Sequence, residues 1–133
     1  VAGFIGSPQM NFYDIILKGN IITFADGNTM KLPDSVIFKL PAQQGEMILG
    51  IRGEDIKLDQ QNLDVFSENK HSAVIENAEV MGNENNLYFT FGGSQTIARV
   101  SKYEISGIGD KIDFVFNPAK LHFFDKNTEV RYV

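Results

Sequence analysis

The stretch Phe12-Tyr-Asp-Ile-Ile-Leu-Lys18, followed by Gly19-Asn20 and then by Ile21-Ile-Thr-Phe-Ala25, decides the fold class of this chain. Two runs rich in β-branched and aromatic residues flank a pair of residues that tolerate positive φ. This pattern is typical of a β-hairpin with a two-residue turn. The sequence therefore predicts two antiparallel strands joined at Gly19-Asn20.

The same pattern is repeated directly afterwards. Asp26-Gly27 supplies a second turn and leads into Asn28-Thr-Met-Lys-Leu32. Pro33 then ends the run, because proline cannot donate to the hydrogen-bond ladder of a central strand. We expect a three-stranded meander over residues 12–32.

Further strands are predicted where short apolar runs lie between turns rich in glycine or asparagine. Residues 35–40 are ambiguous, residues 53–69 indicate an exposed connection, and no long helix is indicated. The spacing of the strands is typical of an all-β fold, either a small barrel or a sandwich, with Phe89, Phe91, Phe114 and Phe116 in its core. The predicted strands beyond the meander are 47–52, 72–80, 87–91, 96–100, 111–116, 121–124 and 129–133.

The composition of the chain limits the classes of function that it can have. With 133 residues, 43% of them hydrophobic, the chain can fill one core. Lys and Arg number 12 against 17 Asp and Glu, so the chain has no cationic stripe for phosphate and nucleic-acid binding is not expected. The absence of cysteine excludes thiolate nucleophiles and Cys-based metal sites. The chain begins Val-Ala-Gly-Phe without an initiator Met, so we expect a piece of a longer protein.

No motif for catalysis is present. The chain lacks the phosphate-binding pattern G-x-x-x-x-G-K-[ST]. His71 is expected to be an exposed loop residue, and His122 a strand residue bonded to backbone. The carboxylate pairs Glu54/Asp55 and Glu76/Glu79 are expected to be solvated surface. The isolated chain is therefore predicted not to be an enzyme, with no catalytic, cofactor-binding or metal-binding residues.

Four stretches, in this order and at this spacing, carry a specific resemblance. They resemble the region downstream of the nucleotide-binding domain in the ATP-binding subunit of bacterial ABC importers for carbohydrates, the maltose-type subfamily. The stretches are Val1-Ala-Gly-Phe-Ile-Gly-Ser-Pro-Gln-Met-Asn-Phe12, Leu49-Gly-Ile-Arg-Gly-Glu-Asp55, Glu79-Val-Met-Gly-Asn-Glu84 and Asn117-Pro-Ala-Lys-Leu-His-Phe-Phe-Asp125.

The resemblance implies an organisation. Residues 1–11 would be the seam from an upstream ATPase domain, and residues 12–133 an OB-like regulatory domain, also called a TOBE domain. Its strands would form one small barrel built from hairpins or two interleaved half-barrels. ATP and Mg would belong to the parent ATPase domain. The family usually has proline after Gly-Ile-Arg, where this chain has Gly53.

Two hypotheses about function follow. The first is a regulatory and dimerisation module of a sugar-importer ATPase, in the cytoplasm at the inner face of the cell membrane. Its partners would be a second copy of the subunit, the membrane subunits and, in some relatives, a regulatory protein. The second is an OB-like module that binds a small oxyanion or an oligosaccharide, with tyrosines as the partly polar platforms. The net acidic charge and the dispersed basic residues favour the first.

Two sets of residues are singled out on this basis. The candidate interaction surface lies at the predicted turn 82–86 and at the motif 121–125, where Phe124 points away from Phe123 by strand alternation. That surface comprises Gly82, Asn83, Glu84, Phe124 and Asp125. The resemblance also marks as structural the motif residues Met10, Asn11, Phe12, Gly50, Ile51, Arg52 and Glu54.

Overall fold

The computed structural model describes residues 10–41, 44–104 and 106–133, so most of the predicted seam at 1–11 lies outside the described residues. The strands are β1 (Met10–Lys18), β2 (Ile21–Phe24), β3 (Thr29–Lys31), β4 (Gln44–Arg52), β5 (Ile56–Lys57), β6 (His71–Val74), β7 (Asn77–Val80), β8 (Glu84–Phe91), β9 (Ser94–Ser101), β10 (Lys111–Phe116) and β11 (His122–Asp125). The helices are α1 (Asp34–Ile37) and α2 (Gln60–Val65), with 3-10 turns η1 (Gly53–Asp55), η2 (Ser67–Asn69) and η3 (Pro118–Lys120).

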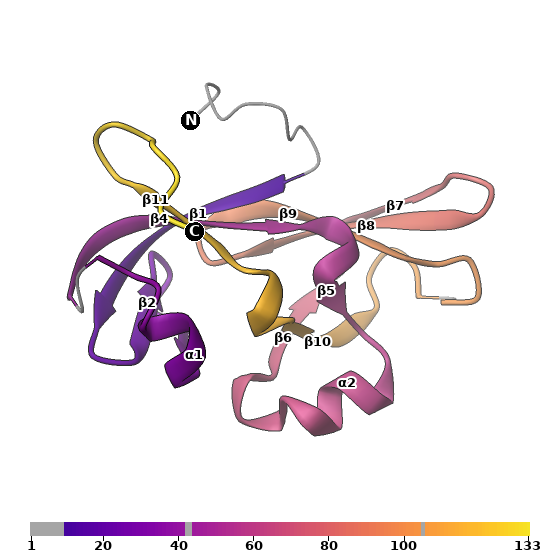
Figure 1. Ribbon diagram of the computed structural model, residues 1–133. Coiled ribbons are helices and arrows are strands. Elements are labelled where there is room, and N and C mark those ends of the chain that lie inside the picture. The colour runs from indigo at the N-terminus through magenta and orange to yellow at the C-terminus, as the bar shows by residue number, and fades with distance from the viewer. Residues whose placement is uncertain (1–9, 42–43, 105) are drawn as a thin grey trace.

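The strands form three antiparallel sheets, which confirms the all-β prediction (Figure 1). The first sheet has the order β11-β4-β1-β2-β3, the second β5-β10-β6 and the third β7-β8-β9. The predicted meander is confirmed, since β1 pairs with β2 next to the Gly19-Asn20 turn and β2 pairs with β3. The described strands remain three sheets around one core rather than one closed barrel. Within the described residues, no helix is both long and apolar enough to span a bilayer.

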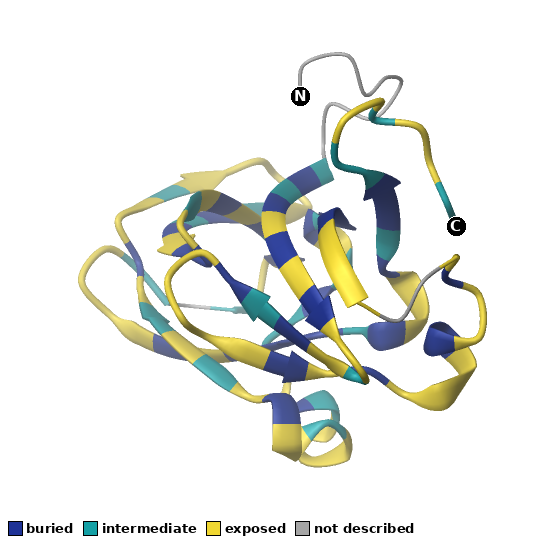
Figure 2. Cartoon of the chain, turned by 90° about the vertical axis from the view of Figure 1, so that its left-hand side faces the viewer, coloured by how far each residue is buried: buried dark blue, intermediate teal, exposed yellow. Residues whose placement is uncertain are grey.

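One core joins the three sheets, and Figure 2 shows buried and exposed residues alternating along strands such as β1, whereas β4 is buried over five consecutive residues. The four predicted core phenylalanines are at most 3% exposed, as expected from the two-residue period of a strand. Tyr13 packs edge-on against Phe24 and Phe91. Burial raises the pKa of its hydroxyl, which is hydrogen-bonded to Thr96 Oγ1 at 2.6 Å. This buried pair ties the first sheet to the third.

The turn between β2 and β3 also contacts the turn between β8 and β9. Gly92 and Gly93 connect β8 to β9 with φ of +64° and +83°, values that favour glycine. The Gly92 N–H donates to Asp26 Oδ2 at 2.8 Å. A side chain at Gly92 would come within 2.9 Å of the Tyr13 and Phe24 rings. Glycine is therefore required here both by backbone conformation and by space.

Several predicted elements were wrong in their bounds. The predicted strand 72–80 is two strands, β6 and β7, which belong to different sheets and are separated by buried Ile75. The predicted exposed connection 53–69 contains η1, β5, α2 and η2, and it buries Ile56 and Leu63 in the core region. The predicted last strand is reduced to one bridge between Phe124 and Arg131. Residues 35–40, which the sequence left ambiguous, contribute to the short helix α1.

His71 is not the exposed loop residue that the sequence predicted. It begins β6, and its ring centroid lies 4.6 Å from that of Phe91 and 5.7 Å from that of Phe114. Its Nε2 is buried with no hydrogen-bond partner among the described residues. Burial lowers the pKa of the imidazole, and the nearby Asp26 carboxylate opposes this shift. The sequence context gave no signal of this, because Asn69, Lys70 and Ser72 are all polar neighbours.

We expect His71→Phe to reduce the loss of stability in acid. The folded state binds the imidazole proton more weakly than the unfolded chain does, because the pKa of His71 is lowered in the folded state. The stability that His71 contributes above its ordinary pKa of 6.5 is therefore lost as the pH falls through the lower pKa of the folded state. The free energy of unfolding in urea, measured at pH about 7 and about 5, should fall less for the variant than for the wild type. An equal fall in both proteins would contradict this account of His71.

Candidate functional site

Three of the four motif stretches meet at one end of the first sheet. The first motif enters β1, the second occupies the end of β4, and the fourth contains β11. These strands are adjacent in the order β11-β4-β1, with Gly50 between Phe12 on one side and His122 on the other. The motif residues of β1 and β4 pair as Met10 with Arg52, Asn11 with Ile51 and Phe12 with Gly50. We call this end of the sheet the motif junction.

Gly50 allows side chains to pack closely over the outer face of the junction. A side chain at Gly50 would come within 2.5 Å of the Met10 sulfur and 3.0 Å of the Phe124 ring. The Phe12 and Phe124 rings meet edge-on with centroids 5.8 Å apart. Together with Ile48 they form a small apolar cluster separate from the main core. The need for a small residue at this position is steric.

The structure places Phe124 in the outer apolar cluster. Its side chain points away from Phe123, as strand alternation predicts, since Phe123 lies in the main core and Phe124 in the outer cluster. However, Phe124 is only 7% exposed. The ring therefore offers little surface to a partner, and its predicted contact role stays a prediction.

Asn11 connects the junction to the third sheet. Its side-chain amide donates to the Ile97 carbonyl at 3.0 Å and to the Ile51 carbonyl at 3.2 Å. Its Oδ1 accepts the Ile97 N–H at 2.8 Å. β9 is an edge strand, so this side chain occupies the place of a neighbouring peptide. Asn11 is 7% exposed, and sequence reasoning marked it only through the family motif.

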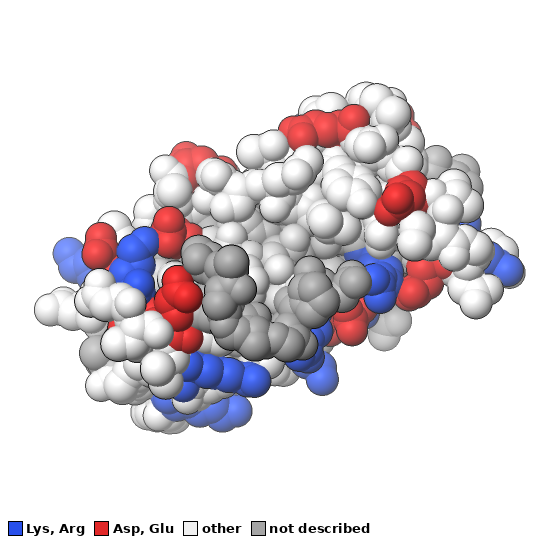
Figure 3. Space-filling model, turned by 90° about the horizontal axis from the view of Figure 1, so that it is seen from above, with Lys and Arg blue, Asp and Glu red and all other residues white. Residues whose placement is uncertain are grey.

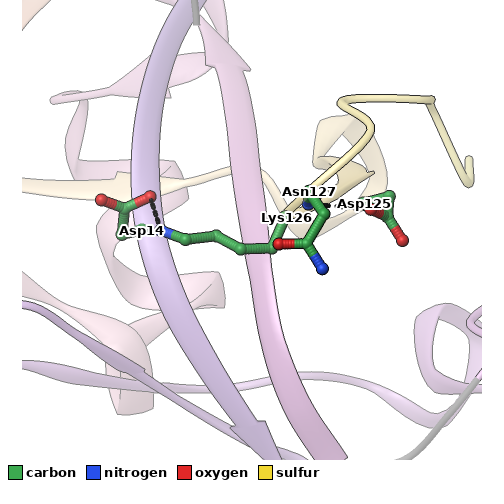
Figure 4. A network of polar contacts seen from close by, with 4 residues as sticks. All are labelled: Asp14, Asp125, Lys126 and Asn127. Atoms are coloured by element: carbon green, nitrogen blue, oxygen red, sulfur yellow. Dashed lines mark hydrogen bonds and ion pairs between the residues drawn. The ribbon is translucent and has the colours of Figure 1, made fainter.

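Asp125 organises the loop that follows β11. Its Oδ1 accepts the backbone N–H groups of Asn127 and Thr128, and its Oδ2 accepts the Tyr132 hydroxyl at 2.7 Å. These hydrogen bonds lower the pKa of the carboxyl to about 2. Lys126 extends across β4 and donates to Asp14 of β1 at 2.6 Å (Figure 4). The Asp125 carboxylate is thus occupied by its own loop.

The other predicted surface residues lie elsewhere. Gly82 and Asn83 form the β7–β8 turn, at the opposite end of the molecule from β11 (Figure 1). The turn is shorter than predicted, since β8 already begins at Glu84, whose carboxylate lies 3.9 Å from Arg99 Nε. Val80 and Met81 beside the turn are 81% and 57% exposed. The structure therefore does not bring the two predicted halves of the interaction surface together.

Basic and acidic side chains are mixed in two grooves of the described residues, which does not favour an anion there. On the face shown in Figure 3, Lys and Arg are interspersed with Asp and Glu. A groove of about 580 Å³ is lined by Lys31 together with Asp34 and Glu68. Among the described residues, no group of His, Asp and Glu is arranged to hold a metal ion.

This geometry defines the class of the protein. It is an OB-like all-β domain whose sequence motifs converge at the start of its first strand. The TOBE domain family model matches residues 49–124, and the MalK OB fold domain model matches residues 6–56. The chain belongs to the TOBE domain family.

Its relatives are ATP-binding proteins of sugar transporters. The multiple sugar-binding transport ATP-binding protein MsmK of Streptococcus mutans is 35% identical over 132 residues, which cover 97% of this chain and 35% of the relative. The trehalose/maltose import ATP-binding protein MalK of Thermococcus litoralis is 36% identical, over 96% of this chain and 36% of its own length. The chain spans about a third of the length of these relatives.

A solved structure shows the same fold. The cytoplasmic molybdate-binding protein ModG matches with a TM-score of 0.69, over 85% of this chain and 94% of its own. Sequence identity is 11%, so this likeness concerns the fold alone.

Gly53 marks the departure from the family motif, and the structure gives a reason for it. Arg52 is extended (φ −77°, ψ 151°), which suits a following proline at the first position of η1. A Cβ at Gly53, however, would lie 2.8 Å from the Ile97 carbonyl oxygen and 3.2 Å from the Arg99 nitrogen. Both are backbone atoms of β9, so β9 itself would have to move.

We expect Gly53→Ala to lower the free energy of unfolding by about 1–3 kcal/mol, because the new methyl group overlaps the β9 backbone. Gly107→Ala is the matched control, since no atom lies within 4 Å of a Cβ there and its φ is not positive. The control should stay within about 0.5 kcal/mol of the wild type in urea unfolding. Equal stabilities for the two variants would mean that η1 and β9 are not in tight contact.

Proposed function

We propose that this chain is the regulatory and dimerisation domain of the ATP-binding subunit of an ABC-type sugar importer. The domain itself is not catalytic, and ATP and Mg bind in a nucleotide-binding domain elsewhere in the parent protein. The parent subunit works at the cytoplasmic face of the membrane, with a second copy of itself, the membrane subunits and, as in some relatives, a regulatory protein as partners.

The observation that carries this proposal is the match of nearly the whole chain to about a third of each sugar-transport ATP-binding relative. The oligosaccharides import ATP-binding protein MsmX of Bacillus subtilis follows the same pattern, with 33% identity over 98% of this chain and 36% of its own length. Packing at the motif junction gives a structural reason for the shared motifs: three of them hold one end of the domain together. A rigid domain at this position suits a module that holds two subunits together.

The β7–β8 turn is the surface that best supports a contact with a second copy. Val80 and Met81 expose large apolar side chains beside Gly82 and Asn83, and methionine is enriched at protein interfaces. A two-fold axis brings the same patch of both subunits together. The turn alone presents less than the ~1,200 Å² of a stable interface, so the parent subunit is the form to test.

The oxyanion alternative has little support in the described grooves. In the groove of about 390 Å³, Lys57 and Arg99 are outnumbered by Glu54, Asp59 and Glu104. An anion would meet net negative charge there.

We expect the double variant Val80→Glu/Met81→Glu to reduce the dimer fraction of the parent subunit in sedimentation equilibrium with ATP, because it places charge in an apolar contact. Phe38→Glu is the matched control: Phe38 is 83% exposed on the C-terminal side of α1, distant in sequence from the turn. A dimer fraction unchanged in the double variant would remove this turn from the interface. A parent subunit that stays monomeric in every nucleotide state would contradict the proposed function.

A further inference from the structure

A groove of about 390 Å³ lies where the end of β9 passes η1 and β5. Its lining residues Arg99 and Ser101 are neighbours of Glu84, where β8 leaves the β7–β8 turn. The volume of the groove is in the range of sites for small ligands. The walls come from segments far apart in sequence, held together because Gly53 lets η1 approach the β9 backbone. The charged and aromatic residues that line it are Glu54, Lys57, Asp59, Arg99, Tyr103 and Glu104, and Ser101 adds a hydroxyl.

Tyr103 stands apart from the other tyrosines. The Tyr13 hydroxyl is hydrogen-bonded to the Thr96 hydroxyl. The hydroxyls of Tyr88 and Tyr132 donate to the carboxylates of Glu79 and Asp125, in that order. The Tyr103 hydroxyl has no hydrogen-bond partner among the described residues, and the side chain is 79% exposed. Its backbone N–H donates to Ser101 Oγ at 3.2 Å, which helps to fix the turn that carries it. Lys102 Nζ lies over the Tyr103 ring, 5.3 Å from its centroid, so the aromatic platform is the face of the ring that Lys102 leaves open.

The charged groups of the groove define which ligand fits the platform. Glu54 is exposed with no described partner, and Glu104 uses only one carboxylate oxygen, which accepts the Ser106 hydroxyl at 2.8 Å. Asp59 is already used, since its carboxylate caps α2 by accepting the Asn62 N–H. Lys57 supplies a donor on the same wall. The net negative charge of the groove disfavours an anion. Hydrogen-bond acceptors and a donor side by side suit a neutral ligand that carries many hydroxyl groups.

We propose that this groove binds a neutral saccharide, with the Tyr103 ring against the C–H face of a sugar ring. The negative face of an aromatic ring attracts polarised C–H groups, and carboxylates form strong charge-assisted hydrogen bonds with hydroxyls. The site would let a sugar act directly on this domain. The groove borders the β7–β8 turn, but Val80 and Met81 do not line it, so variants of the groove and variants of the turn test the two properties separately.

Titration of the ¹⁵N-labelled 133-residue chain with maltose, trehalose and maltotriose tests the proposal by NMR. At least one sugar should give saturable shifts at Glu54, Lys57 and Tyr103, with Kd about millimolar. Tyr103→Ala should weaken that binding about tenfold or more, whereas Tyr103→Phe should retain it, because stacking needs the ring and not the hydroxyl. Glu54→Gln should weaken it as well, since an amide oxygen accepts less strongly than a carboxylate.

Phe38→Ala is the matched control for a merely sticky aromatic residue, since Phe38 is equally exposed but lies outside the groove. It should leave sugar binding unchanged. Glucose 6-phosphate should bind more weakly than the neutral sugars. The proposal is overturned if none of the three sugars saturates, if Tyr103→Ala binds like the wild type, or if Phe38→Ala loses binding to the same extent.

Discussion

The side chain of Asn11 takes the place of a missing peptide between β1 and β9. Its amide meets both the N–H and the carbonyl of Ile97, and it also reaches the Ile51 carbonyl on β4. Without it, the backbone N–H and carbonyl of Ile97 on this edge strand would lose their partner at a partly buried position, which is costly. The packing of Gly53 against β9, and with it the groove beside Tyr103, depends on β9 being held in this place.

A second buried asparagine uses the same device at the other end of the fold. Asn69 accepts the Lys31 N–H and donates to the Lys31 carbonyl, both at 2.9 Å, and thereby covers the open edge of β3. The first sheet is thus tied to the third by Asn11 and to the helical connection by Asn69. Short strands with protected edges are a common way to avoid edge-to-edge pairing.

The sequence predicted what depends on local pattern. The hairpin at Gly19-Asn20 and the inward faces of residues 87–91 and 111–116 follow from periodicity and turn chemistry, and both are confirmed. The break at Ile75, the burial of His71 and the covering of Phe124 were missed because each is decided by residues distant in sequence. The motif residues could be named through the family resemblance, but the bonds made by Asn11 carry no local signal.

Hydrogen exchange of the Ile97 amide tests the central claim most directly, because that N–H donates to the Asn11 side chain. In Asn11→Ala its protection should fall about tenfold or more relative to the wild type, as expected for a lost hydrogen bond at a partly buried site. Asn77→Ala, at an exposed position of β7, should leave it unchanged. Equal protection of Ile97 in the wild type and in Asn11→Ala would contradict the account that Asn11 holds the first and third sheets together.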